Sequence, residues 1–108
     1  MTTHSNGASG HSPVSLDYTV DLSGVPPNAR IVSAQATYSL PVSSPTVTDS
    51  GGSGGTSVVW GAAGIALLNS AMGGTVSVHA VGSWAGSPPV AAFNISTFAV
   101  GWIQPNYP

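Results

Sequence analysis

Apolar and polar side chains alternate along three long segments of this chain. Residues 14–23 carry an apolar side chain at every second position, which is the period of a strand with one buried face. Residues 75–84 show the same alternation, and so do residues 30–40, whose apolar face is predicted to begin at Val32. Residues 90–103 are apolar on both faces, which predicts a strand that is central in a sheet or lies at an interface.

The middle of the chain is less regular. Residues 46–48 and 57–60 are short strand candidates, and the glycine-rich run 51–55 between them predicts a hairpin tip or a mobile insert. Residues 62–72 admit two interpretations. Their Ala, Leu and Met residues favour a short helix that ends at the following glycine pair. A buried strand that bends at glycine fits nearly as well, because short apolar runs do not reveal their period.

These elements predict a single all-β domain. Several short strands separated by glycine and proline are typical of an antiparallel β-sandwich or jelly roll, which we expect over residues 14–108 with at most one short helix near 62–72. Residues 1–13 are rich in Ser, Gly and Thr and predict an extended polar N-terminal arm. An arm of this composition needs a surface to lie on, so we expect it to run along a neighbouring subunit. Removing residues 1–12 should then leave the domain folded.

The scarcity of charge narrows the possible functions. The charged residues are Arg30, Asp17, Asp21 and Asp49, and they make up 4% of the chain against about a quarter in an ordinary domain. One arginine cannot neutralise a run of phosphates, which excludes nucleic acid and anionic membranes as partners. A surface of small uncharged side chains suits burial against other subunits, so we expect a homo-oligomer or a larger assembly.

The first ten residues do not resemble a secretory signal, since they have neither a positive region nor an apolar one. We therefore expect synthesis in the cytoplasm of a host cell without export by that route. The absence of Cys fits a reducing compartment. The longest apolar stretch, residues 62–68, is far shorter than the about 20 residues that span a bilayer.

No residue set has the spacing of a catalytic site. Asp17 and Asp21 are expected about 13 Å apart on one strand, beyond the about 5–9.5 Å that separates paired catalytic carboxylates. Both are expected to be solvated, and one could pair with Arg30. His79 is expected to be an ordinary exposed histidine. The run 51–55 matches the letters Gly-x-Ser-x-Gly but lacks the strand–turn–helix context of a nucleophile elbow, so we predict that the chain is not an enzyme.

The remaining candidates are contact residues near the two ends of the chain. His4 and His11 lie in the predicted arm, and Trp102, Ile103 and Tyr107 lie near the C-terminus. The histidines lack the spacing of zinc ligands, so we expect no metal and no cofactor. These five residues are instead predicted to contact partner subunits.

Aromatic side chains leave a second possibility open. Trp60 and Trp84 are expected to pack in the core, but exposed aromatic faces could also stack on sugars. A carbohydrate-binding module would expose two or three aromatic side chains on one face, whereas a structural subunit would use them in its core and contacts.

Two segments carry a resemblance to a protein class. Residues 21–34 read Asp-Leu-Ser-Gly-Val-Pro-Pro-Asn-Ala-Arg-Ile-Val-Ser-Ala, and residues 93–103 run from Phe-Asn-Ile to Gly-Trp-Ile. Residues 21–34 resemble a segment of viral and extracellular β-sandwich domains. Residues 93–103 resemble the last strand of small all-β bacteriophage virion proteins, such as capsid decoration proteins and the β-sandwich domains of tail fibres. The resemblance implies a structural virion protein, a capsid decoration or cement protein or another surface subunit. Its partners would be the major capsid protein or copies of itself.

Two other functions remain as alternatives. One is a carbohydrate-binding module or the receptor-binding domain of a tail fibre, either of which would use exposed aromatic side chains on a glycan. The other is a secreted appendage or adhesin subunit, which the lack of a secretory signal disfavours.

Overall fold

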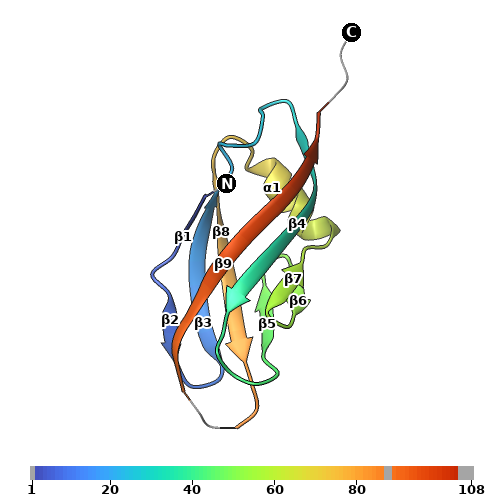
Figure 1. Cartoon of the computed structure of the whole chain (residues 1–108). Coiled ribbons are helices and arrows are strands. Elements are labelled where there is room, and N and C mark those ends of the chain that lie inside the picture. The colour runs from blue at the N-terminus through green and yellow to red at the C-terminus, as the bar shows by residue number, and fades with distance from the viewer. Residues whose placement is uncertain (1, 87–88, 105–108) are drawn as a thin grey trace.

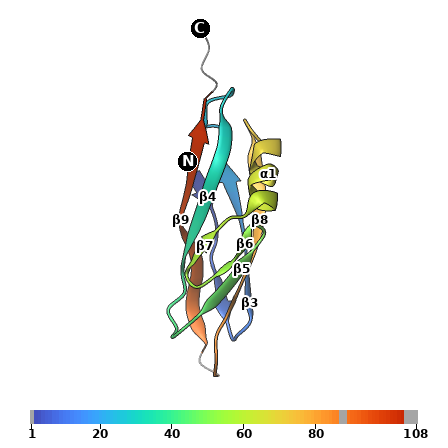
Figure 2. The ribbon, with the colours of Figure 1, turned by 90° about the vertical axis from the view of Figure 1, so that its right-hand side faces the viewer.

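The computed structural model describes residues 2–86 and 89–104 and is a sandwich of two antiparallel sheets packed face to face (Figure 1, Figure 2). The first sheet has the strand order β1-β3-β8-β5-β6, with β1 Thr2–His4, β3 Val14–Asp21, β8 Thr75–Ser83, β5 Thr46–Asp49 and β6 Gly52–Gly54. The second has the order β2-β9-β4-β7, with β2 Ala8–Gly10, β9 Val90–Ile103, β4 Arg30–Ser39 and β7 Ser57–Val59. The predicted all-β sandwich is therefore confirmed.

The N-terminal residues belong to the sandwich and do not form a separate arm. β1 pairs with β3, where His4 lies opposite Thr19, and β2 pairs with β9, where Ala8 lies opposite Phe93. The polar segment is extended, as expected, but it finds its backbone partners in its own chain. Strands of three residues are too short to show alternation, which is why the sequence did not reveal them. Deleting residues 1–12 would remove both strands, so we no longer expect the remaining domain to be unaffected.

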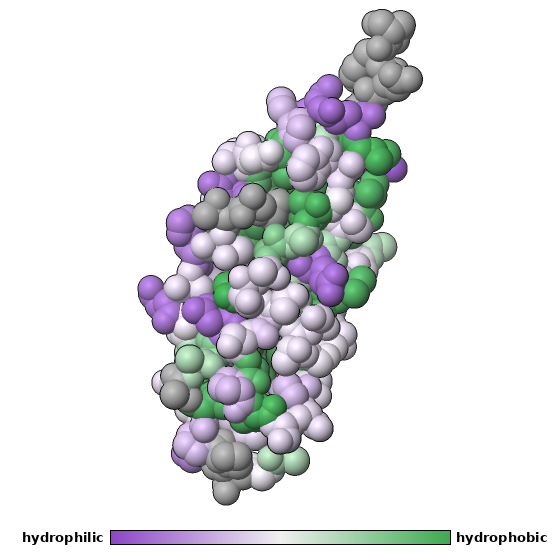
Figure 3. All heavy atoms as spheres, in the orientation of Figure 1, coloured by the Kyte–Doolittle hydropathy of each residue, from purple (hydrophilic) through white to green (hydrophobic). Residues whose placement is uncertain are grey.

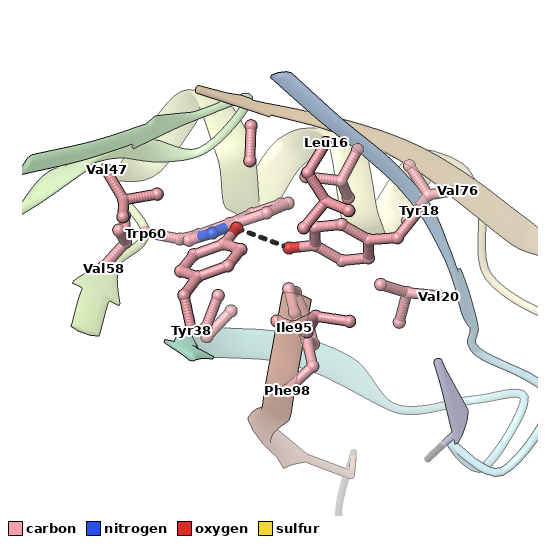
Figure 4. Close-up of a cluster of buried hydrophobic side chains, with 14 of the residues drawn as sticks. Leu16, Tyr18, Val20, Tyr38, Val47, Val58, Trp60, Val76, Ile95 and Phe98 are labelled. Atoms are coloured by element: carbon pink, nitrogen blue, oxygen red, sulfur yellow. Dashed lines mark hydrogen bonds between the residues drawn. The ribbon is translucent and has the colours of Figure 1, made fainter. Parts of the chain in front are cut away.

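The core lies between the sheets and is built from the predicted apolar faces. In β3 and in β8 every second side chain is buried. The largest fully buried side chains include Leu16, Val20, Val78 and Phe93, and Figure 4 shows part of this cluster. Complete burial of such a side chain contributes about 1.5–3 kcal/mol, so the alternating strands supply the main stabilisation of the fold.

The apolar face of β4 begins at Ile31, not at Val32 as predicted. The pairing of β4 with β9 shifts its register between Ile31 and Ser33. Such a bulge inserts one extra residue into one strand, and Val32 is left 46% exposed. Two adjacent apolar residues look equivalent in the sequence, so only the pairing with β9 decides which of them is buried.

Residues 62–72 contain the helix α1 Ala62–Ser70, which confirms the helical interpretation and excludes the strand. The helix lies close to Trp60 and the β5–β6 turn because Gly64 has no side chain. An added Cβ at Gly64 would lie 2.8 Å from Cε3 of Trp60 and 2.8 Å from the Cα of Gly51. No helix within the described ranges is long and apolar enough to cross a membrane.

The glycine-rich run 51–55 lies at the hairpin between β5 and β6, where Asp49 pairs with Gly52. The hairpin is thus confirmed, but the expected loop is not, because Gly52–Gly54 form strand β6 and the tip lies at residues 50–51. Gly51 packs directly against the indole ring of Trp60, since an added Cβ would lie only 1.9 Å from its Cδ2 atom. A tryptophan that follows β7 therefore holds the turn in place.

Candidate interaction surface

Charged side chains are segregated in the sandwich. Asp17 and Asp21 lie on the outer face of β3, in the first sheet, and Asp17 is directly opposite His79 of β8. Their exposed side chains are hydrogen-bonded, with 2.7 Å between Asp17 Oδ1 and His79 Nδ1. Asp21 accepts a hydrogen bond from the backbone N–H of Ser23, which lowers the pKa of its carboxyl. The expected pairing of Asp17 or Asp21 with Arg30 is wrong, because neither forms an ion pair with it within the described part of the chain.

Asp49 lies between the two sheets and was not recognised in the sequence as a structural residue. It is 8% exposed. Its Oδ2 atom accepts hydrogen bonds from the hydroxyl of Tyr38 at 2.5 Å and from Nε1 of Trp60 at 3.2 Å. Its Oδ1 atom accepts the backbone N–H groups of Gly51 at 2.9 Å and Gly52 at 3.1 Å. Both oxygens are therefore engaged by the chain itself, and the carboxylate anchors the hairpin.

A second tyrosine completes this buried network. The hydroxyl groups of Tyr18 and Tyr38 are 2.7 Å apart, as Figure 4 shows, and the Tyr18 hydroxyl is the donor because Tyr38 donates to Asp49. Burial raises the pKa of both tyrosines well above the ordinary value, and the hydrogen bond to Asp49 adds to the shift for Tyr38. The network connects strands of both sheets and stabilises the fold. Its carboxylate is not presented to solvent as a site.

The outer face of the second sheet differs from that of the first by being almost free of charge. Apart from Arg30 at the start of β4, no described residue of its four strands is charged. Figure 3 looks onto this face and shows mainly pale residues of intermediate hydropathy with hydrophobic ones between them. At its centre Gln35 lies between Val59 and Ala99. These residues border a shallow depression of about 330 Å³.

One end of this face is apolar. Val32 and Ile103 are 46% and 52% exposed there, where β4 and β9 pair, whereas Trp102, which is 42% exposed at the same end, lies on the core side of β9 with Phe98 and Val100. Two of the predicted contact residues, Trp102 and Ile103, are thus available to a partner. Tyr107 lies outside the described residues.

The two predicted histidines lie elsewhere. His4 is exposed on β1, in the first sheet, and His11 is exposed in the segment that joins β2 to β3. The structure therefore does not join the two histidines and the C-terminal pair, Trp102 and Ile103, into one contact site.

The edge of β9 is a structural feature that the sequence did not reveal. β2 pairs with β9 only at Phe93 and Val90, while β4 pairs with the other side of β9 from Asn94 to Ile103. On the β2 side, residues 96–103 have no strand partner in the described part of the chain. In Figure 1 the upper half of β9 accordingly borders β4 on one side only.

Hydrogen bonding across β4 shows which β9 residues face this open edge. The carbonyl of Ala34 and the N–H of Tyr38 point towards the β7 side. Because the direction of the backbone N–H and C=O groups alternates along a strand, those of the odd-numbered residues between Ala34 and Tyr38 point towards β9. Phe98 and Val100 lie opposite Ala36 and Ala34. Their backbone N–H and C=O groups therefore point away from β4, to the open edge, and alternation places those of Trp102 there too.

The free edge of β4 is covered in a different way. β7 stops short of the first residues of β4, and the side chain of Asn69 takes its place. The Asn69 Oδ1 atom accepts the N–H of Ile31 at 2.9 Å, and its Nδ2 atom donates to the C=O of Ile31 at 2.9 Å. A groove of about 540 Å³ lies between α1 and this edge, with Arg30 and Ile65 among its lining residues. One edge of the second sheet is thus closed by a side chain, whereas the other has no strand partner along residues 96–103 in the part of the chain that the structure describes.

Neither a metal site nor an aromatic platform is apparent in the described residues. They contain no group of three or more His, Cys, Asp or Glu side chains that could hold a metal ion. Trp60 and Trp84 are buried, which confirms their expected place in the core, and Trp102 is the one exposed aromatic side chain among those described. Comparison with known proteins adds nothing, since no family model, curated protein or solved structure matches the chain.

Proposed function

We propose that this chain is a non-catalytic structural subunit that assembles with other protein chains through the outer face of the β2-β9-β4-β7 sheet. The observation that carries the proposal is the segregation of charge. Asp17 and Asp21 lie on the outer face of the first sheet, whereas the centre of the second carries small uncharged residues around Gln35. Burying such a face costs no desolvation of an ionised group.

Side-chain entropy favours the same face. Most of its exposed side chains are Ser, Thr, Ala and Val, which lose less rotamer freedom on burial than Lys, Arg or Glu. Hydroxyl groups at Ser33 and Thr37 can donate or accept hydrogen bonds across a contact. The exposed apolar side chains of Val32 and Ile103 add the hydrophobic part of an interface at one end.

The setting that we propose is the surface of a bacteriophage particle, where the chain would act as a capsid decoration or cement protein or as another surface subunit. The support is the resemblance of residues 93–103 to such proteins and of residues 21–34 to viral and extracellular β-sandwich domains. These segments supply half of β4 and most of β9, and therefore a large part of the proposed contact face. The carbohydrate-binding alternative has weaker support, because it rests on one exposed aromatic side chain, Trp102, in the described residues.

The test is to purify virus particles by density-gradient sedimentation from cells that produce the native chain. We expect the chain in the particle fraction at a fixed ratio to the other structural proteins. In a rebinding assay with stripped particles, Gln35→Glu places a charge at the centre of the face and should weaken attachment. Thr48→Glu places the same charge on the outer face of the first sheet and should not. A chain found only among the free proteins of the lysate would overturn the virion setting.

A further inference from the structure

We propose that the open edge of β9, from Phe98 to Trp102, pairs antiparallel with the same edge of a second copy of this chain. This inference rests on the proposed assembly role and names one partner for it. The two second sheets would then form one continuous sheet across a two-fold axis. Such an interface is isologous, because each copy contributes the same residues.

The first argument is the contrast between this edge and the others. The strands β1, β2, β6 and β7 at the remaining edges have three residues each. Very short edge strands and covered edges are the usual protections against pairing with another chain, and the Asn69 side chain covers the start of β4. Residues 96–103 belong to a strand of 14 residues and have no strand partner on this side within the ranges 2–86 and 89–104. They contain no proline and no charged residue.

The second argument is the strand register that the edge-facing backbone N–H and C=O groups of β9 require in the dimer. In antiparallel pairing, residues with outward-pointing backbone groups lie opposite one another. Centring the axis on Val100 places Val100 opposite Val100 of the second copy and Phe98 opposite Trp102. About six backbone hydrogen bonds then form from groups that have no strand partner among the described residues of one copy. No like charges are opposed, because the segment is uncharged.

The third argument is the exposure of Trp102. Phe98 is buried and Val100 packs against the core, so alternation directs Trp102 to the same side of β9. It is nevertheless 42% exposed. In the proposed dimer it lies beside the Phe98 ring of the second copy, and aromatic cross-strand pairs stabilise antiparallel strands. The dimer therefore covers an aromatic side chain that one copy leaves open.

The size of the contact sets the expected affinity. A single pair of short strand segments buries less than the about 1,200 Å² in total that marks the lower end of stable interfaces. The dimer should therefore dissociate on dilution, and sedimentation velocity of the full-length chain over a wide concentration range is the appropriate measurement. Hydrogen exchange provides a second readout, since the amide of Val100 should become protected only at concentrations where the dimer forms.

Charge substitutions at the axis test the register. Val100→Lys and Val100→Glu each place two like charges directly opposite one another, so each variant alone should show a dissociation constant raised about tenfold or more. An equimolar mixture of the two should regain the dimer, because opposite charges then meet. Circular dichroism and thermal unfolding of each variant show whether it is folded. Gln35→Glu, on the sheet face, serves as the control and should dimerise normally.

The outcomes separate this inference from the proposed function. A chain that is monomeric at every concentration with an unprotected Val100 amide overturns the inference, even if it binds particles. If the dimer still forms with Val100→Lys but is disrupted by Gln35→Glu, the contact lies on the sheet face. That result also overturns the proposed pairing of β9 edges. Loss of the dimer in both variants with recovery in the mixture supports it. If the chain dimerises in this way but is absent from virus particles, the result supports the β9-edge dimer and contradicts the proposed function.

Discussion

The hydroxyl group of Tyr38 and the carboxylate of Asp49 form a 2.5 Å hydrogen bond that connects the two sheets through the core. Tyr38 comes from β4 of the second sheet and Asp49 from β5 of the first. A buried carboxylate is costly unless donors surround it, and here four donors of the chain do so. The bond therefore fixes the β5–β6 hairpin and the spacing of the sheets together.

Replacing Tyr38 with Phe should destabilise the fold by about 1–3 kcal/mol, because it removes a donor to a buried charged acceptor. It also leaves the Tyr18 hydroxyl without its acceptor. Urea unfolding followed by tryptophan fluorescence measures the change. Tyr18→Phe is the matched control and should cost less, since Asp49 keeps all its donors. Equal effects of the two substitutions would contradict the proposed direction of the chain of hydrogen bonds.

The same network predicts alkaline instability. The ordinary tyrosine pKa is 10.0, and burial raises the pKa of Tyr18 and Tyr38 in the folded chain. Above pH 10 the unfolded chain loses protons that the folded chain retains, so the stability from these neutral groups is complete below pH 10 and falls as the pH rises. Unfolding free energies measured on both sides of pH 10 should show this decline. Its slope should be shallower in Tyr18→Phe, and an unchanged slope would refute the assignment.

Gly64→Ala should destabilise the protein although alanine is the better helix former. The helix gains up to about 1 kcal/mol from the substitution, but the new Cβ would lie 2.8 Å from Cε3 of Trp60 and from the Cα of Gly51. Overpacking of this kind lowers the free energy of unfolding by about 1–3 kcal/mol. Thermal unfolding measures the net effect. Gly61→Ala is the control, because an added Cβ there meets nothing within 4 Å.

Asn69→Ala should expose the edge of β4 and promote self-association. The substitution removes both hydrogen bonds to the backbone of Ile31. This loss should lower the free energy of unfolding by about 1–3 kcal/mol. An uncovered edge also becomes a template for another strand. Light scattering at constant concentration should show larger particles than in the unsubstituted chain. Ser70→Ala, a neighbouring substitution that leaves Ile31 paired, should show neither effect.

Assembly through the outer face of the second sheet should be insensitive to sodium chloride up to molar levels. Salt screens charge pairs, and apart from Arg30 this face has no charged residue in the described strands. Sulfate should strengthen the contact, because excluded salts favour apolar burial. Sedimentation of the assembled material at increasing salt concentration is the measurement. Dissociation in moderate sodium chloride would point to a different interface.

Local periodicity was sufficient to predict much of the sandwich. Alternation identified the buried faces of β3 and β8, because the side-chain period of two belongs to each strand alone. Helix propensity and the glycine pair after it made α1 one of two interpretations, and the contact role of Trp102 and Ile103 stays a prediction. Such features depend on neighbours in the sequence, so they can be predicted without knowledge of the fold.

Pairing between distant residues decided the rest. The strands in residues 2–10 and the bulge that exposes Val32 exist only through their partners in β3 and β9. Asp49 is acceptable inside the core only because Tyr38, Trp60 and the turn bring their donors to it. The open edge of β9 follows from where β2 ends. Backbone hydrogen bonds and buried polar groups need a partner supplied by another part of the chain, and only the tertiary structure shows which groups have one.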